Sequence, residues 1–473
     1  MKEDFLAKLR NGETLNTRQL IKMITWLSVP AILAQISSIV MQYIDASMLG
    51  HLGSQEAASI GLVASSTWLM GGLCMAMNIG FTVQIAQAIG AKENVQARNL
   101  VRMGMITGLL WSILLLTIGV LVSESLPGWL RGDIALHGSS TVYFLVFALS
   151  MPIFELNHLA GGMIQCSGNM KLPSILHILM CLLDVVFNAF LIFPSLSFEI
   201  CSFQITLPGF GFGVFGAALG TVLAEGVVAF FMLRYLLIKS PLLSLRREER
   251  FVFSMPHLTK AFRLAAPIGF EQFVMSGAQI ASTYILAPLG SVAIAANSFS
   301  VTAESLCYMP GYGIASAATT MIGQAIGAGR KELTRRLAWL TTWMGMGIMA
   351  ATGALMFVFA PEMIAIISTD PEVRRLGTLI LRIEAFAEPM YGASIVANGV
   401  FRGAGDTFAP SCMNLVSMWA IRIPLAAYLA PIYGLKGVWI AMASELTCRG
   451  CMFLIRLKGN RWENKSKKWV ESA

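Results

Sequence analysis

The chain has 473 residues, of which 56% are apolar and only 13% are charged, against roughly 25% charged residues in an average soluble domain. This composition excludes a water-soluble globule, a disordered chain and a scaffold built on disulfides. The net charge of +8 is also typical of polytopic membrane proteins, which collect Lys and Arg in their cytoplasmic loops, so we expect no nucleic-acid partner.

Twelve stretches are long and apolar enough to cross a bilayer, which takes about 20 mostly apolar residues. They cover, approximately, residues 21–49, 57–80, 99–122, 138–160, 172–194, 213–238, 261–287, 293–317, 336–360, 376–400, 408–430 and 437–456. The polar first 20 residues do not resemble a signal peptide. The sequence therefore predicts an all-α polytopic membrane protein with 12 transmembrane helices.

The distribution of basic residues predicts the orientation of these helices. With the N-terminus inside the cell, 26 of the 34 Lys and Arg residues fall in inner segments. The outer loops then hold only Arg131, Arg374, Arg375 and Lys436. Positive charge in short loops is retained on the cytoplasmic side, so we expect a multi-pass protein of the plasma (inner) membrane with both termini in the cytoplasm.

An internal repeat divides the chain in two. A shift of 237 residues brings Pro30 onto Pro267 and residues 87–91, Gln-Ala-Ile-Gly-Ala, onto the same letters at 324–328. The register of the repeat shows a 13-residue insertion in the first half, and the segment 195–208 is predicted to contain it as an external loop. We therefore predict two pseudo-symmetric six-helix lobes with the following boundaries: an N-terminal lobe 1–238, a solvated cytoplasmic linker 239–260, a C-terminal lobe 261–456 and a cytoplasmic tail 457–473.

Two parallel lobes are typical of a carrier that works by alternating access, with the substrate path between the lobes. The sequence has no Walker A loop, nucleophile elbow or metal-binding motif, so we predict that the protein is not an enzyme and has no cofactor. With no nucleotide-binding domain, transport would draw on a gradient of H⁺ or Na⁺. The eight cysteines are expected to be buried small hydrophobes.

Carboxylates at membrane depth are costly and therefore candidates for function. Asp45 lies near the outer end of the first span, and two pairs spaced four residues apart, Asp184 with Asn188 and Thr221 with Glu225, lie in the outer halves of the fifth and sixth. Their oxygens could ligate Na⁺, and paired carboxylates could equally carry a proton. The sequence does not choose between the two ions.

The second half does not repeat this constellation. It has its own intramembrane set, composed of Glu271, Glu304, Arg382, Glu384, Glu388, Arg422, Glu445 and Arg449. Arg422 needs a buried carboxylate partner, for which we favour Glu271 or Glu388. A structural ion pair and a transport role are equally compatible with the sequence here, and Glu155 of the first half is similarly undecided.

Four motifs resemble those of the multidrug and toxic compound extrusion (MATE) transporters. They are residues 45–53 (DASMLGHLG), 87–91 (QAIGA), 165–169 (QCSGN) and 402–407 (RGAGDT). The first is similar to the family's D-x-x-M-x-G-x-L-G and the last to its R-G-x-G-D-T. The resemblance runs from about residue 20 to 456 and implies a V-shaped protein of two bundles that exports cationic, amphipathic compounds in exchange for H⁺ or Na⁺.

The resemblance also implies a first-lobe cation site at Asp45, Asp184, Asn188 and Thr221, which would hold Na⁺ if that is the coupling ion. The order Asp then Asn at 184 and 188 departs from the Asn then Asp of the nearest branch. Other branches carry an acidic residue where this chain has Tyr391, which favours coupling through the first lobe.

An alternative function is an ion-driven flippase for lipid-linked sugars. Such a protein would need a cavity rich in Arg and Lys to hold a pyrophosphate, whereas acidic residues line the predicted site. The expected partners are therefore small cationic or amphipathic organic molecules and the lipid bilayer, with the protein acting as a monomer.

Overall fold

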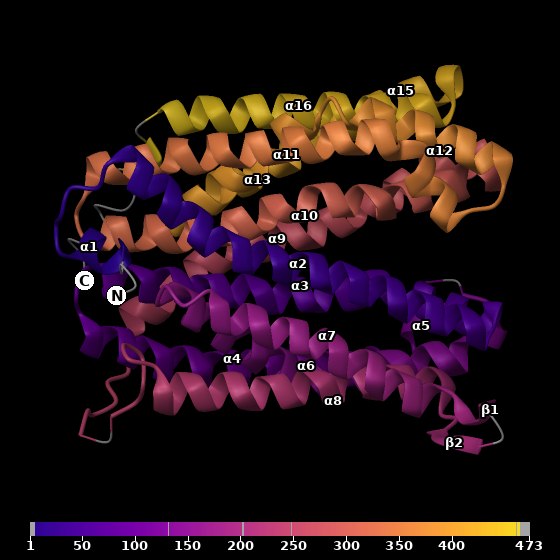
Figure 1. Cartoon of the computed structure of the whole chain (residues 1–473), viewed down its shortest axis with the longest axis horizontal. Coiled ribbons are helices and arrows are strands. Elements are labelled where there is room, and N and C mark those ends of the chain that lie inside the picture. Colours follow the sequence, from indigo (N-terminus) through magenta and orange to yellow (C-terminus); the bar gives the residue numbers. More distant parts are fainter. Residues whose placement is uncertain (1–4, 131, 201–202, 247, 460, 464–473) are drawn as a thin grey trace. The chain divides into compact units, whose positions relative to one another are not determined.

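The computed structural model describes residues 5–130, 132–200, 203–246, 248–459 and 461–463, and it is built almost entirely of helices (Figure 1). Within these residues, nine helices are long and apolar enough to cross a membrane. They match nine of the twelve predicted spans. The all-α polytopic class predicted from composition is therefore confirmed. Arg131, Cys201 and most of the predicted tail lie outside the described residues.

The other three predicted spans correspond to helices that are more polar or shorter. α9 (Met255–Leu286) and α10 (Ser291–Gly327) are long, but they contain many Ser, Thr, Gly and Gln residues. The span predicted at 376–400 is divided into α12 (Pro371–Glu384) and α13 (Glu388–Gly403). Pro389 explains the break, since proline is favoured in the first turn of a helix and disfavours a helical residue before it.

The chain folds as two compact units that interleave along the sequence. One comprises residues 37–82 and 94–258, and the other comprises 1–36, 83–93 and 259–473. We call them the first and the second unit. They do not follow the predicted lobe boundary at residues 239–260, because two early segments belong to the second unit. The predicted lobes rest on the sequence repeat and stay a prediction.

The first unit holds the C-terminal part of α2 (Thr17–Leu52), most of α3 (Ser54–Gly90) and five further helices. These are α4 (Asn94–Val122), the short α5 (Leu126–Trp129), α6 (Ile134–Cys166), α7 (Lys171–Ile192) and α8 (Gly213–Arg234), which continues as the π-helix η1 (Tyr235–Lys239). α8 packs against both α6 and α7, and a core of Val63, Met70, Leu115, Phe144 and Met151 joins α3, α4 and α6.

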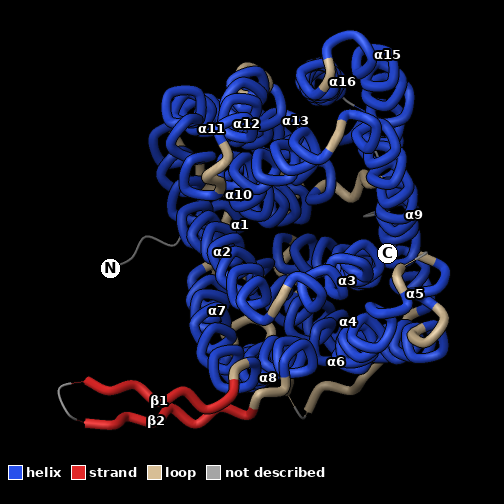
Figure 2. The backbone as a smooth tube through the Cα atoms, turned by 90° about the vertical axis from the view of Figure 1, so that its right-hand side faces the viewer, coloured by secondary structure: helices blue, strands red, loops and turns tan. Residues whose placement is uncertain are grey.

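A β-hairpin connects α7 to α8 where the sequence predicted a loop. Its strands are β1 (Pro194–Ile200) and β2 (Phe203–Phe210), which pair antiparallel (Figure 2). The segment alternates apolar and polar residues, as in Leu196, Phe198 and Ile200, which favours a strand. An external loop was predicted here, and its two strands were not anticipated.

The second unit begins with α1 (Phe5–Arg10) and the first part of α2, and it contains the remaining helices. After α9 come the 3₁₀ turn η2 (Ala287–Leu289), α10, α11 (Lys331–Ile367), α12, α13, α14 (Phe408–Val416), the π-helix η3 (Ser417–Arg422), α15 (Ile423–Tyr433) and α16 (Leu435–Lys458). The π-helix ends at Arg422, just before Pro424, whose missing N–H interrupts the regular α-helical hydrogen bonds.

The two copies of the repeated Gln-Ala-Ile-Gly-Ala motif pack against each other inside the second unit. A side chain at Gly90 would meet the backbone of Gln324, and one at Gly327 would meet the backbone of Gln87. The contact is thus reciprocal, as expected for two copies related by pseudo-symmetry. It explains why residues 83–93 belong to the second unit, and why both positions are glycine.

Replacing Gly327 by Val is expected to destabilise the protein by about 1–3 kcal/mol, since there is no space for the added methyl groups. Gly347 of α11 provides a matched control because a side chain there has open space around it. Thermal unfolding in detergent should show a clear loss for Gly327→Val and a much smaller one for Gly347→Val. Equal melting temperatures for the two variants would show that the motif contact does not constrain the fold.

The linker 239–260 is anchored to α4, although Arg246, Glu248 and Arg250 of its charge run are exposed to solvent. The Arg98 guanidinium donates to the Glu249 carboxylate at 2.5–3.0 Å. Arg102 donates to the carbonyls of Glu249 and Arg246 at 2.6 and 2.7 Å. Asn99 exchanges hydrogen bonds with the backbone of Val252. These three residues lie close together in the second and third turns of α4, and they hold the linker there.

The Arg98 contact makes the stability of this region depend on pH. The hydrogen bond from Arg98 holds the pKa of Glu249 below its usual range. The contact therefore stabilises the folded state fully above the unfolded pKa of about 4.3. This stabilisation is lost as the pH falls through the lower pKa of the folded state. Glu249→Gln should therefore lower the melting temperature at pH 7.5, and the difference should shrink at pH 4. Glu248→Gln, one residue away, is the control; a difference that stayed constant with pH would argue against the ion pair.

The cysteine prediction is only partly right. Cys74, Cys166, Cys181 and Cys307 are buried, whereas Cys448 and Cys451 are exposed on α16. They are three residues apart and therefore share one helix face. On a membrane-spanning helix, small hydrophobic side chains can face lipid at no cost.

Candidate functional site

Three of the predicted site residues meet in the first unit through direct hydrogen bonds. The side-chain amide of Asn188 donates to Asp45 at 3.0 Å and to Asp184 at 3.1 Å. Asp184 and Asn188 are adjacent on one face of α7 because they are four residues apart, and α2 supplies Asp45. The two carboxyl groups are therefore held on either side of a single nitrogen.

This cluster is shielded from solvent but not saturated. Asp184 is 0% exposed and Asn188 1% exposed. Yet one carboxylate oxygen of Asp184 and the amide oxygen of Asn188 have no hydrogen-bond partner among the described residues. Buried polar atoms without partners are costly, so the site retains acceptor oxygens for a proton or a cation.

α8 completes the wall of the site by approaching α7 closely. Gly220 lies against Asn188, and a side chain there would collide with the amide. Thr221, next to it, is close to Asp184, and its hydroxyl donates to the carbonyl of Ala217 at 3.3 Å. Glu225, one turn further, is 8% exposed and interacts electrostatically with Asp184. The structure thus brings the four predicted site residues together, with Glu225 beside them.

Glu155 of α6 forms a second buried acidic position in the first unit. It is 0% exposed, and neither of its carboxylate oxygens has a hydrogen-bond partner in the described structure. Its nearest polar neighbours are Cys74 and Asn78 of α3. Gly108 of α4 makes room for it. Cys74 also interacts electrostatically with Glu225.

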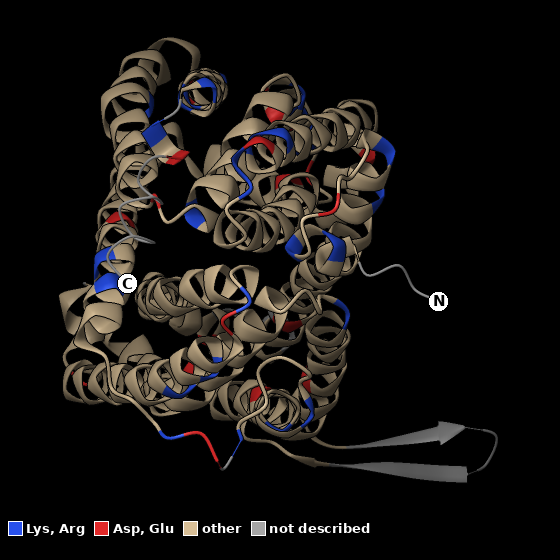
Figure 3. Cartoon of the chain, turned by 90° about the vertical axis from the view of Figure 1, so that its left-hand side faces the viewer, with Lys and Arg blue, Asp and Glu red and all other residues tan. Residues whose placement is uncertain are grey.

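The second unit contains a separate acidic cluster, as the sequence indicated. Glu384, Glu388 and Glu445 are 0% exposed, Glu304 is 5% exposed, and each of the first three has carboxylate oxygens without a hydrogen-bond partner among the described residues. Figure 3 shows that acidic and basic residues form scattered bands on helices that are mostly uncharged. Four carboxylates in one apolar region require compensating charge or protons.

Two arginines supply part of that compensation. Arg449 pairs with Glu445 at 3.2 Å, and its guanidinium lies over the ring of Tyr391, 5.3 Å from the centroid. Arg422 interacts with Glu304 and Glu384. Glu271 or Glu388 was favoured from the sequence as the partner of Arg422. Glu271 instead accepts hydrogen bonds from Ser411 at 2.6 Å and from Asn414 at 2.7 Å. Sequence spacing could not reveal these partners, because in each case they lie on a different helix, far away in the chain.

No group of three or more His, Cys, Asp and Glu side chains in the described part of the chain is arranged to hold a metal ion. A Na⁺ ion at the Asp45 cluster would therefore need amide, hydroxyl or backbone oxygens as well as the two carboxylates. The unpartnered oxygens of Asp184 and Asn188, together with the hydroxyl of Thr221, are of the kind that a hard cation uses.

Comparison with known proteins gives a consistent result across the chain. The MatE family model matches residues 30–190 and 267–428. A curated relative, "Probable multidrug resistance protein NorM" of Thermotoga maritima, is 26% identical over 461 residues, which cover 95% of this chain and 94% of the relative. "Uncharacterized transporter YisQ" of Bacillus subtilis is 23% identical and covers 89% of this chain and 90% of its own.

Solved structures show the same fold. The Vibrio cholerae MATE transporter VcmN in its bent form aligns with a TM-score of 0.84 at 19% identity, over 96% of this chain and 99% of that one. A transporter of the MOP superfamily from Pyrococcus furiosus aligns with a TM-score of 0.83 at 20% identity, over 97% and 98%. At such identities the likeness shows the arrangement of the helices, and the chemistry has to be argued from the residues above.

Proposed function

Since the chain belongs to the MatE family of membrane transporters, we propose that it is a secondary active antiporter that exports cationic or amphipathic drugs and toxins in exchange for H⁺ or Na⁺. The observation that carries this proposal is the buried cluster of Asp45, Asp184 and Asn188, with acceptor oxygens still available. The curated relative from Thermotoga maritima bears a multidrug resistance name, which supports the substrate class.

The geometry suggests how exchange would work. Two carboxyl groups that contact one amide cannot both stay charged and buried without a compensating cation or proton. A cationic substrate and the coupling ion would therefore compete for the same negative charge, and the binding of one would disfavour the other. Occupation by the ion would change the hydrogen bonds that join α2 to α7, so these helices would repack around the cluster and release the substrate.

The membrane location and the orientation of the antiporter are part of the proposal. We place it in the plasma (inner) membrane as a monomer with both termini in the cytoplasm, since the basic residues gather in the segments that would then face inward. It needs no cofactor, because the ion gradient supplies the energy. Glu225 and Glu155 extend the acidic path away from the Asp45 cluster, while Glu271, Glu388, Arg422 and Tyr391 of the second unit are secondary candidates.

The experiment that tests this function is ethidium export from cells or inverted vesicles, driven by a pH gradient alone and then by a sodium gradient alone. Export driven by one gradient identifies the coupling ion. If neither gradient moved ethidium in protein shown to be folded and inserted, the multidrug proposal would fail. The flippase for lipid-linked sugars would then become the better candidate.

A further inference from the structure

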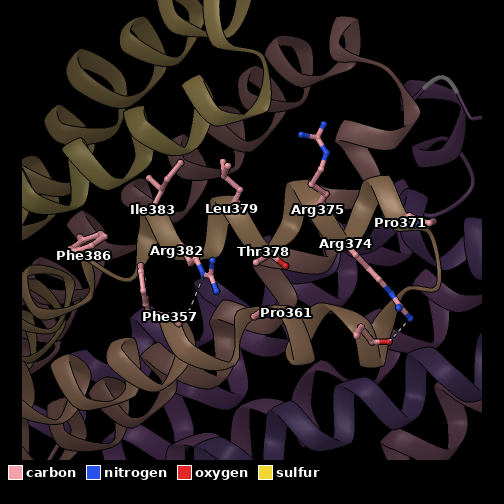
Figure 4. A pocket seen from close by; sticks show the side chains of 11 residues that line it. Phe357, Pro361, Pro371, Arg374, Arg375, Thr378, Leu379, Arg382, Ile383 and Phe386 are labelled. Atoms are coloured by element: carbon pink, nitrogen blue, oxygen red, sulfur yellow. Dashed lines mark hydrogen bonds between the residues drawn. The ribbon is translucent and has the colours of Figure 1, made fainter.

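A groove of about 970 Å³ lies between the end of α11 and α12, entirely within the second unit (Figure 4). Its apolar lining is formed by Phe357 and Pro361 of α11, by Leu379 and Ile383 of α12, and by Phe386 just beyond α12. Phe386 is 77% exposed and Phe357 is 38% exposed. This surface is not part of the Asp45 cluster or of the acidic cluster around Glu384.

The charged part of the lining is entirely basic, and Ala365, Pro371 and Thr378 complete it. Arg374, Arg375 and Arg382, all on α12, border the groove, and no carboxylate is among the described residues that line it. Arg374 is occupied with the end of α11, since it donates to the carbonyls of Ser368 at 2.6 Å and Ala365 at 3.3 Å. Arg382 and Arg375 each bond one protein group, Phe357 and Glu372 respectively, through part of the guanidinium, so N–H groups on both remain for a ligand.

Arg382 is oriented by its contacts with Phe357. Its Nε donates to the Phe357 carbonyl at 3.2 Å, and its guanidinium lies over the ring, 5.3 Å from the centroid. Arg375 is seven residues earlier, so its Cα lies on the same face of α12, two turns away, and its side chain extends away from α11 (Figure 4). It pairs with the exposed Glu372 at 3.0 Å. Leu379 lies between the two arginines on that face, so charge and apolar surface alternate along the groove.

The depth of the groove in the membrane follows from α11. The uncharged run of this helix lies between Arg336 and Glu362. Phe357 is 20 residues beyond Leu337, or about 30 Å along the helix, which is the thickness of the hydrocarbon core. The start of α11 is on the side of the N-terminal segment, because Arg330 donates to the Glu13 carbonyl at 2.7 Å. Phe357 and Arg382 therefore lie at the opposite bilayer surface, at the level of lipid phosphates.

We propose that this groove binds an anionic phospholipid, with its phosphate held by Arg382 and Arg375 and an acyl chain lying against Phe357, Pro361 and Leu379. Guanidinium groups match the geometry of a phosphate. The absence of lining carboxylates gives the required charge complementarity. A free phosphate ion would use only the arginines and leave the apolar lining exposed, and a zwitterionic lipid would bring a cationic group next to them.

The test uses the purified full-length protein in detergent, titrated with phosphatidylglycerol or with phosphatidylcholine of the same acyl chains. Native mass spectrometry gives the affinity, and the shift in melting temperature gives an independent measure. Phosphatidylglycerol should bind more tightly and stabilise more. Arg382→Gln should weaken its binding about tenfold, the effect of losing one charge-assisted contact. Lys436→Gln removes one charge from the same predicted side of the membrane and should change nothing.

Two further arms separate the sources of the phosphate group and guard against misfolding. Inorganic phosphate and deacylated glycerophosphoglycerol should neither compete with the lipid nor stabilise the protein. If Arg382→Gln fails to fold, Arg375→Gln tests the same contact, since that side chain is well exposed. Equal affinity for the two lipids, equal losses in the arginine and Lys436 variants, or competition by inorganic phosphate would each overturn the proposal.

Discussion

Asp45→Asn is expected to reduce substrate export by about 10- to 100-fold, the range of a typical coupling free energy, while leaving the protein folded. An asparagine has nearly the same shape as aspartate and can still form a hydrogen bond with Asn188, so packing around α2 and α7 should persist. It cannot carry a negative charge or bind a proton. The exchange of ion for substrate would then lose the group for which both compete.

The matched control is Asp133→Asn, which makes the same substitution in the same unit but away from the cluster. Asp133 is the N-cap of α6 and accepts a hydrogen bond from the Ala135 N–H at 3.2 Å. Asparagine is an equally good N-cap. Ethidium efflux should therefore be normal in Asp133→Asn and nearly absent in Asp45→Asn at equal protein levels. Normal efflux in the Asp45 variant would remove the basis for the proposed coupling site.

Arg449→Met should destabilise the protein by about 3–5 kcal/mol, because it leaves the carboxylate of Glu445 buried without its partner. Glu445 is 0% exposed, and the buried Glu384 interacts with it electrostatically. The Arg449 side chain is only 11% exposed, so water cannot replace the lost charge. The loss should appear at pH 7.5 as a lower melting temperature and poorer recovery from detergent.

Adding Glu445→Gln to the Arg449 variant is expected to restore most of that stability, because the double variant no longer buries an unpaired charge. The two single variants and the double variant form a cycle that isolates the pair from the volume change at residue 449. If the double variant were as unstable as Arg449→Met, the cost would come from lost packing against Tyr391, and the ion pair would contribute little.

Local features of the sequence were enough to predict the helical class and the polar pair on α7. Apolar runs of 20 residues specify a spanning helix almost regardless of context, because backbone groups in lipid must bond within their own helix. The four-residue spacing of Asp184 and Asn188 put both on one face of α7. The relation of that face to Asp45 came from the family resemblance, and the amide bridge between the two carboxyl groups was not foreseen.

Features that depend on distant segments were predicted less well. Glu271 was a candidate partner for Arg422, yet Ser411 and Asn414 of α14 hold it, and nothing near Glu271 in the sequence announces them. The linker contact of Arg98 with Glu249 joins residues 151 positions apart. The hairpin at 194–210 was missed because its short strands were treated as an insertion. In each case the decisive contact is tertiary.

The interleaving of the two units constrains the order in which the chain can mature during synthesis. Residues 1–36 and 83–93 are made early, but their partners in the second unit begin only at residue 259. Gly90 and Gln87 must therefore wait for the motif at 324–328 to be inserted before their close contact can form. Contacts this distant in sequence form late and slowly. In a fragment that ended in the linker, the helix surfaces of residues 1–36 and 83–93 would have no protein partner. We expect membrane proteases to degrade such a fragment faster than the full-length chain.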